Sequence, residues 1–167
     1  MVTALFKDSK GVERAYQSVA KRGYAIGDIN VVMSDDTRKK YFSDDRHVKN
    51  EQGSKAAEGG ELGGPTGGGI HIIIPILAAG AVLALPGLGL ILAGPMAAAL
   101  AGAGAAGLAV GLMGALTDWG IPEERVRQYQ AGINDGGILM GVKPRSDQDA
   151  RYIKQQWKTS GGQHVHS

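Results

Sequence analysis

The feature that most constrains this chain is a long internal stretch without charge. Residues 62–117 contain no Asp, Glu, Lys or Arg, and their only ionisable side chain is that of His71. The residues on either side of this stretch carry acidic and basic side chains in nearly equal numbers, and the formal net charge of the whole chain is +2. The sequence therefore predicts two polar flanks that are separated by an apolar insertion.

The composition excludes several classes of protein. A chain of 167 residues has about the size of one domain with an appendage, which excludes a large multi-domain enzyme. It contains no cysteine, so disulfides, thiolate metal ligands and a cysteine nucleophile are excluded. A net charge this small does not indicate binding to nucleic acid, and we expect no nucleic-acid partner.

The first flank, residues 1–34, has the pattern of a strand, a helix and a second strand. In the strand expected over Val2–Phe6, Val2, Ala4 and Phe6 share one face, and the apolar side chains of Val12–Ala20 recur at helical spacing. Ile29–Met33 again alternates. Residues 35–69 contain too few apolar side chains to fold alone, and we expect them to form a polar and Gly-rich linker.

The last flank, residues 118–167, predicts a helix from Pro122, a strand over Ile138–Val142 and a helix that Ser146 caps. The closing residues GQHVHS are expected to add an edge strand. Joined across the insertion, the flanks match the element order of an α+β, ferredoxin-like split βαβ domain, with two helices on one face of four strands. The helix from Pro122 is an extra element in this arrangement.

The insertion, residues 70–117, is expected to form a hydrophobic helical hairpin. Ile70–Leu92 and Met96–Leu116 are each close to the ~20 residues that a helix needs to cross a membrane. Prolines and glycines between residues 86 and 95 would form the turn. A hairpin returns the chain to its starting side, which would allow the two flanks to build one domain.

Small residues recur along the second predicted helix and indicate close packing between helices. They are Ala103, Gly107, Gly111, Gly114 and Ala115. Such a glycine-zipper ridge lets helix backbones approach closely, so we expect these residues to form the contact between helices or between copies of the chain. The ridge would be covered either by lipid or by other subunits, and the sequence leaves both alternatives open.

Other motifs do not indicate chemistry. GAGAAG at residues 102–107 matches a dinucleotide-binding pattern, but it follows an Ala-rich segment rather than a strand. His164 and His166 alternate in the last strand, but two imidazoles without a third ligand are more typical of a solvated tail than of a metal site. We therefore assign no catalytic residue, no metal site and no cofactor.

Several segments resemble, in order, the bacterial general stress protein or heat-induced stress protein family. They are INVVMSDDTRKKYF, SKAAEGGELGG, PGLGLILAGPMAAALAGAGAAG and GALTDWGIPEERVRQYQAGINDGGILMGVKP. The resemblance implies a stress-associated, non-enzymatic protein with a ferredoxin-like domain and a Gly-rich hydrophobic insertion. It implies no catalytic residue, and the tail GGQHVHS departs from the family pattern.

Together these features predict a structural protein that forms homo-oligomers through the Gly/Ala-rich hairpin. We expect it at the inner membrane, in contact with lipid and with its α+β domain in the cytoplasm. One alternative is a cytoplasmic homo-oligomer that buries the hairpins in its interior. Another is a sensor that binds a small ligand on the open sheet face or the Gly-rich loop.

Overall fold

The computed structural model describes residues 1–42, 81–85, 89–102, 114, 116–117 and 120–167. These residues form an α+β structure with one antiparallel sheet of six strands and five α-helices. The strands are β1 (Val2–Phe6), β2 (Ile29–Ser34), β3 (Val82–Leu85), β4 (Leu90–Ala93), β5 (Ile138–Val142) and β6 (Gln163–His166). The helices are α1 (Ser9–Ala20), α2 (Asp35–Phe42), α5 (Pro95–Gly102), α7 (Glu123–Asn134) and α8 (Asp147–Thr159), and a short 3-10 turn spans Ile26–Asp28.

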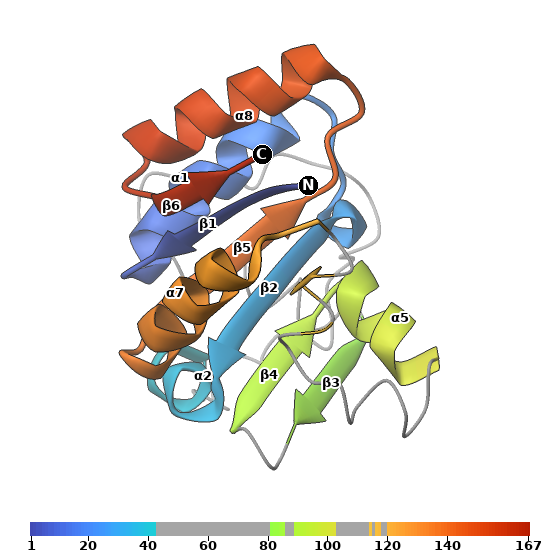
Figure 1. Ribbon diagram of the computed structural model, residues 1–167. Helices are drawn as coiled ribbons and strands as arrows, with labels where there is room; N and C mark the ends of the chain where they lie inside the picture. The colour runs from blue at the N-terminus through green and yellow to red at the C-terminus, as the bar shows by residue number, and fades with distance from the viewer. Residues whose placement is uncertain (43–80, 86–88, 103–113, 115, 118–119) are drawn as a thin grey trace, which may run out of the picture.

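The strand order in the sheet is β3-β4-β2-β5-β1-β6, and every neighbouring pair is antiparallel (Figure 1). The central pairs β2·β5 and β1·β5 join the two polar flanks, which are far apart in the sequence. The flanks therefore close into one sheet, as the sequence predicts. The segment between them adds β4 and β3 beside β2.

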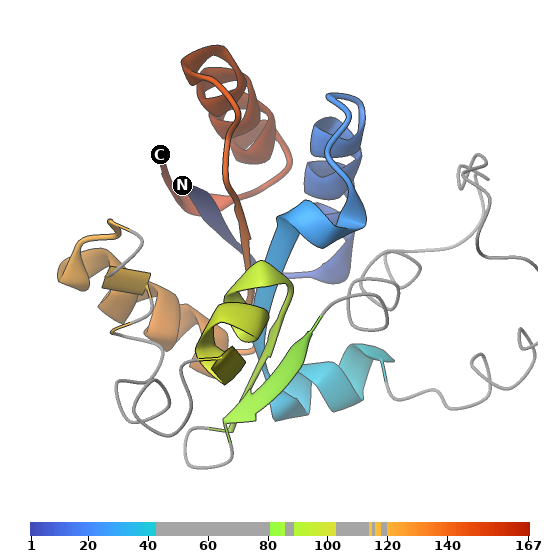
Figure 2. The same cartoon turned by 90° about the vertical axis from the view of Figure 1, so that its right-hand side faces the viewer.

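Helices α1 and α8 pack side by side on one face of the sheet (Figure 2). The core under them contains the alternating residues Val2, Ala4 and Phe6 of β1 and their counterparts on β2 and β5. Trp157 of α8 lies against Phe6 edge to face, with ring centroids 6.1 Å apart. The indole N–H donates to the Ala15 carbonyl at 3.1 Å, which ties α8 to α1.

The opposite face carries a second core under α7 and α5. Leu5, Val32 and Leu139 point from the strands into this core, and Met96 of α5 and Tyr129 of α7 meet them. The helix from Pro122, expected as an extra element, thus covers the second face of the sheet. Burial on both faces explains why every residue of β1, β4 and β5 is buried.

The predicted elements of the two flanks are confirmed, including the edge strand formed by the closing residues. The helix ends follow the capping residues. The Asp8 carboxylate accepts from the Gly11 N–H at 2.7 Å at the start of α1, and the Ser146 hydroxyl accepts from the Asp149 N–H at 3.1 Å at the start of α8.

The expectation of a helix over Ile70–Leu92 is wrong where the structure describes this range. Val82–Leu85 and Leu90–Ala93 are antiparallel strands, and β4 pairs with β2 along its whole length. A short apolar run does not distinguish a buried strand from a buried helix by periodicity. In this chain Leu90–Ala93 forms a strand because it pairs with β2. As a strand it buries side chains in the cores on both faces of the sheet.

The second predicted helix, Met96–Leu116, is helical wherever the structure describes it, in α5 and at Gly114 and Leu116. Residues 103–113 and 115 lie outside the described part of the chain, and so do residues 70–80 and 86–88 of the first predicted helix. No helix in the described ranges is both long enough and apolar enough to cross a bilayer.

The predicted linker, residues 35–69, begins with a helix, so the expectation is wrong for Asp35–Phe42. This helix is stabilised by its N-terminal cap and by charged side chains near its ends rather than by burial of an apolar face. The Ser34 hydroxyl accepts from the Thr37 N–H at 3.1 Å, and the acidic residues of the first turn and the basic residues of the last complement the helix dipole. The Asp35 carboxylate pairs with Lys39 at 2.6 Å and with Arg38, and these hydrogen bonds lower the pKa of Asp35.

Candidate functional site

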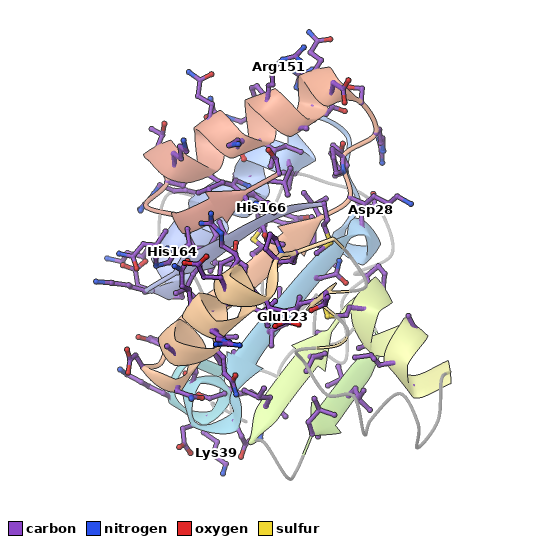
Figure 3. The ribbon with its side chains drawn as sticks, in the orientation of Figure 1. Asp28, Lys39, Glu123, Arg151, His164 and His166 are labelled. Atoms are coloured by element: carbon purple, nitrogen blue, oxygen red, sulfur yellow. The ribbon has the colours of Figure 1, made fainter. Side chains whose placement is uncertain are left out.

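The outer surface of β3 and α5 carries no charge. Val82 is the only large hydrophobic residue exposed within the described ranges, with 48% of its surface accessible. Ala84 is exposed on the same face of β3 as Val82. Ala81, which precedes the strand, and Ala98, Ala99 and Ala101 of α5, which covers the other face of the sheet, are exposed as well. In Figure 3 the side chains of β3 and α5 show no nitrogen or oxygen atoms, whereas Lys39 and Arg151 project from opposite ends of the molecule. We call this region the β3–α5 surface.

Two residues fix α5 beside the sheet. Gly94 joins β4 to α5 with a φ of +101°, and a Cβ at this position would overlap the backbone carbonyl of Ile29. Only glycine allows this close approach. The Asn30 side chain, buried in the sheet, accepts a hydrogen bond from the Met96 N–H at 2.7 Å and donates to the Gly141 carbonyl at 3.4 Å. The helix start is therefore attached to β2.

The predicted packing ridge lies almost entirely outside the described residues. Ala103, Gly107, Gly111 and Ala115 are not described, and Gly114 is described as partly exposed. The structure therefore does not test whether the ridge is an interface. The β3–α5 surface belongs to the same uncharged segment of the sequence and ends where the ridge begins.

A second candidate site is an open groove of about 920 Å³ at the end of the sheet where β2 begins and β5 ends. Its lining combines apolar and charged side chains: Met1, Tyr24, Asp28, Asn30, Pro95, Lys143, Pro144 and Arg145. The basic residues follow β5 directly and precede the Ser146 cap of α8. The groove therefore lies between the two polar flanks and the start of α5.

Tyr24 organises one wall of the groove. Its hydroxyl donates to the Asp149 carboxylate at 3.1 Å and accepts from the Arg145 N–H at 2.9 Å. The Arg145 guanidinium lies 4.3 Å from the centre of the Tyr24 ring and pairs with Asp28 at 3.0 Å. Burial raises the pKa of Tyr24, the hydrogen bond from the Arg145 N–H opposes this, and the hydrogen bond to Asp149 raises the pKa as well.

The groove has a surplus of positive charge. Asp28 compensates Arg145, and the Lys143 ammonium forms no hydrogen bond or ion pair within the described part of the chain. A small anion with an apolar or planar portion would match this combination of a cation, an aromatic edge and prolines. Nothing in this wall supplies an activated nucleophile.

A buried polar cluster connects α7 with β1 and β6. The Tyr129 hydroxyl donates to the His164 carbonyl at 2.6 Å and lies 2.9 Å from the Thr3 hydroxyl, and both Tyr129 and Thr3 are fully buried. Burial raises the pKa of Tyr129. The register of β6 shifts opposite β1 between Thr3 and Leu5, and His164 adopts a φ of 50° there. This is a β-bulge.

The bulge breaks the simple alternation that the sequence predicts for His164 and His166, both labelled in Figure 3. Burial lowers the pKa of His166, and the positive charges of Arg125, the N-terminus and Lys154 lower it further. In the ranges that the structure covers, no group of three His, Cys, Asp or Glu side chains is arranged to hold a metal ion.

Sequence reasoning missed both the free strand β3 and the groove. The signals were present, since KPR at residues 143–145 follows a predicted strand and Tyr24 follows the end of a predicted helix. Comparisons with protein-family models, with curated proteins and with solved structures found no match.

Proposed function

We propose that the protein is a non-enzymatic, stress-associated structural protein that assembles with copies of itself through its uncharged segment. The observation that carries this proposal is the β3–α5 surface, where a strand and a helix present only uncharged side chains to solvent. An uncharged strand at the edge of a sheet is a template for pairing with another chain, and this supports the proposal. The stress association rests on the resemblance of the ordered sequence segments.

The proposal includes a ferredoxin-like core formed by β1, α1, β2, β5, α8 and β6. The order β2-β5-β1-β6, the antiparallel pairing and the position of α1 and α8 on one face support it. In this description β3, β4 and α5 are an addition to the β2 edge. The ferredoxin-like core would provide a stable folded domain, and β3, β4 and α5 would form the contact with other copies.

The test is the mass of the full-length chain in solution, measured by sedimentation equilibrium over a hundredfold range of concentration. We expect a species larger than the monomer. Gly107→Leu and Gly111→Leu, which would separate backbones at the ridge, should weaken assembly while the circular dichroism of the sheet is retained. Gly27→Leu is the matched control, because a Cβ at Gly27 meets no atom within 4 Å.

Alternatively, the same uncharged segment contacts lipid at the inner membrane. Flotation with vesicles of neutral and anionic lipid distinguishes lipid contact from self-assembly. Recovery of the protein with the vesicles, with no self-association in buffer, would replace assembly by lipid contact. A monomer that also ignores vesicles would reject both.

The groove supports a second candidate function, the binding of a small anionic ligand. Lys143 and the Tyr24 wall carry this candidate. A panel of nucleotides, carboxylates and inorganic phosphate should include a compound that raises the melting temperature with a saturable dependence on concentration. Lys143→Gln should abolish the shift, and the control Lys158→Gln on the last turn of α8 should preserve it. A flat response to the whole panel would reject this candidate.

A further inference from the structure

The outer edge of β3 is free within the described residues. β3 pairs with β4, and no strand lies on its other side in the described part of the sheet (Figure 1). The Gly94 N–H donates to the Ala81 carbonyl at 3.1 Å. Because hydrogen-bonded pairs alternate along antiparallel strands, the N–H and C=O groups of Val82 and Ala84 point to the outer edge.

The two edges of the sheet differ in how they resist pairing with another strand. β6 carries the bulge at His164 and polar side chains, which are common protections of an edge. β3 has a regular register with β4 and contains neither a charge nor a proline. Of these edges, β3 is the one whose backbone is available to a partner strand as far as the described residues extend.

The chemistry of β3 favours a second copy of the same strand as the partner. Its side chains are Val, Leu, Ala and Leu, and a charged partner strand would lose hydration against them without gaining an ion pair. An antiparallel strand is complementary to itself under a two-fold rotation. Helix α5 packs on the face of β3 that carries Leu83, and its exposed alanines leave that side of the strand uncharged too.

We propose that β3 pairs antiparallel with β3 of a second copy, about a two-fold axis that passes at Leu83. In this register Val82 lies opposite Ala84 of the second copy, and Leu83 lies opposite Leu83. Every outward N–H and C=O of Val82 and Ala84 is then used, whereas a register centred on either of these residues would leave some unpaired within the strand. The inference rests on the proposed self-assembly and specifies its geometry.

Disulfide trapping tests the register, because the native chain has no cysteine. Leu83→Cys would place two thiols at a non-hydrogen-bonded pair with Cα atoms about 4.5 Å apart, which is within disulfide range. We expect a covalent dimer on mild oxidation. The double variant Val82→Cys with Ala84→Cys, on the other side of the strand, should also form it. Gln163→Cys on β6 is the control and should remain monomeric on a denaturing gel.

A backbone variant tests the hydrogen bonds. Ala84→Pro removes an outward N–H that β4 does not use, so we expect at least a tenfold weaker self-association with the sheet intact. Ala84→Thr retains the N–H and should assemble like the native chain. The circular dichroism of each variant reports whether the sheet has folded.

The outcomes separate this inference from the proposed function. Cross-linking of both cysteine variants together with the loss of assembly in Ala84→Pro supports β3 pairing. An oligomer that neither cross-links nor responds to Ala84→Pro would overturn β3 pairing and leave self-assembly through another surface, such as the ridge. A native chain that is monomeric at all concentrations would overturn both.

Discussion

The Asn30 side chain of β2 accepts a hydrogen bond from the backbone N–H of Met96, in the first turn of α5, at 2.7 Å. This contact joins the N-terminal flank to the uncharged segment, and Asn30 is only 4% exposed. The described part of the insertion is therefore packed into the domain, with its first helix attached to the central sheet.

Asn30→Ala should destabilise the protein by about 1–3 kcal/mol, because it leaves the buried Met96 N–H without an acceptor. Urea unfolding measures the change. Asn134→Ala, at the exposed end of α7, is the matched control and should change the free energy of unfolding by less than about 0.5 kcal/mol. Equal effects of the two variants would contradict a capping role for Asn30.

Gly94→Ala should be strongly destabilising. The φ of +101° costs an L-residue about 1–3 kcal/mol, and overlap of the new Cβ with the Ile29 carbonyl adds to this. Hydrogen exchange should show increased opening of β4 and α5. Gly102→Ala, at the end of the same helix, meets no atom within 4 Å and should be neutral or slightly stabilising.

Tyr129→Phe should cost about 1–3 kcal/mol of unfolding free energy, because the His164 carbonyl and the buried Thr3 hydroxyl both lose a partner. The double variant Tyr129→Phe with Thr3→Val should cost less than the sum of the two single changes. Tyr152→Phe, on the partly exposed side of α8, is the control for removal of a phenol hydroxyl and should have little effect. Additivity of the two single changes would show that the hydroxyl pair is not coupled.

His166 should make stability depend on pH. Its pKa is lowered in the folded state, so the folded chain binds fewer protons than the unfolded chain. The free energy of unfolding should therefore fall as the pH drops below about 6.5, the ordinary value for histidine, until the lower pKa of the folded state is reached.

The pH effect can be isolated with two variants. His166→Asn should flatten the dependence between pH 7.5 and 5 relative to the native chain. His164→Asn should retain it, and asparagine tolerates the positive φ of the bulge. If both variants titrate like the native chain, His166 does not contribute.

The polar flanks were predictable because their local signals agree with their tertiary environment. Val2, Ala4 and Phe6 lie together in the core under α1 and α8, as their spacing predicts, and Ser146 caps α8 as its position predicts. Even the closing segment GQHVHS, whose pattern predicts a strand only weakly, contains the strand β6.

The insertion was less predictable because its composition is compatible with either strand or helix. Leu90–Ala93 contains four apolar residues in sequence, and pairing with β2 rather than local periodicity makes it a strand. Helix α2 was missed because its stability comes from Ser34 and Asp35 at its start, not from apolar content. The groove was missed because Tyr24 and Arg145, 121 positions apart, meet only in the folded chain.

The bulge at His164 has a consequence for how large an assembly can become. Pairing through β3 consumes the open edge of each copy, and the opposite edge is distorted where a further molecule would have to dock. Growth by strand addition would thus stop at a closed pair instead of extending into a fibre. A single irregular residue in the last strand would in this way protect a chain with an unusually uncharged interior segment from amyloid-like polymerisation.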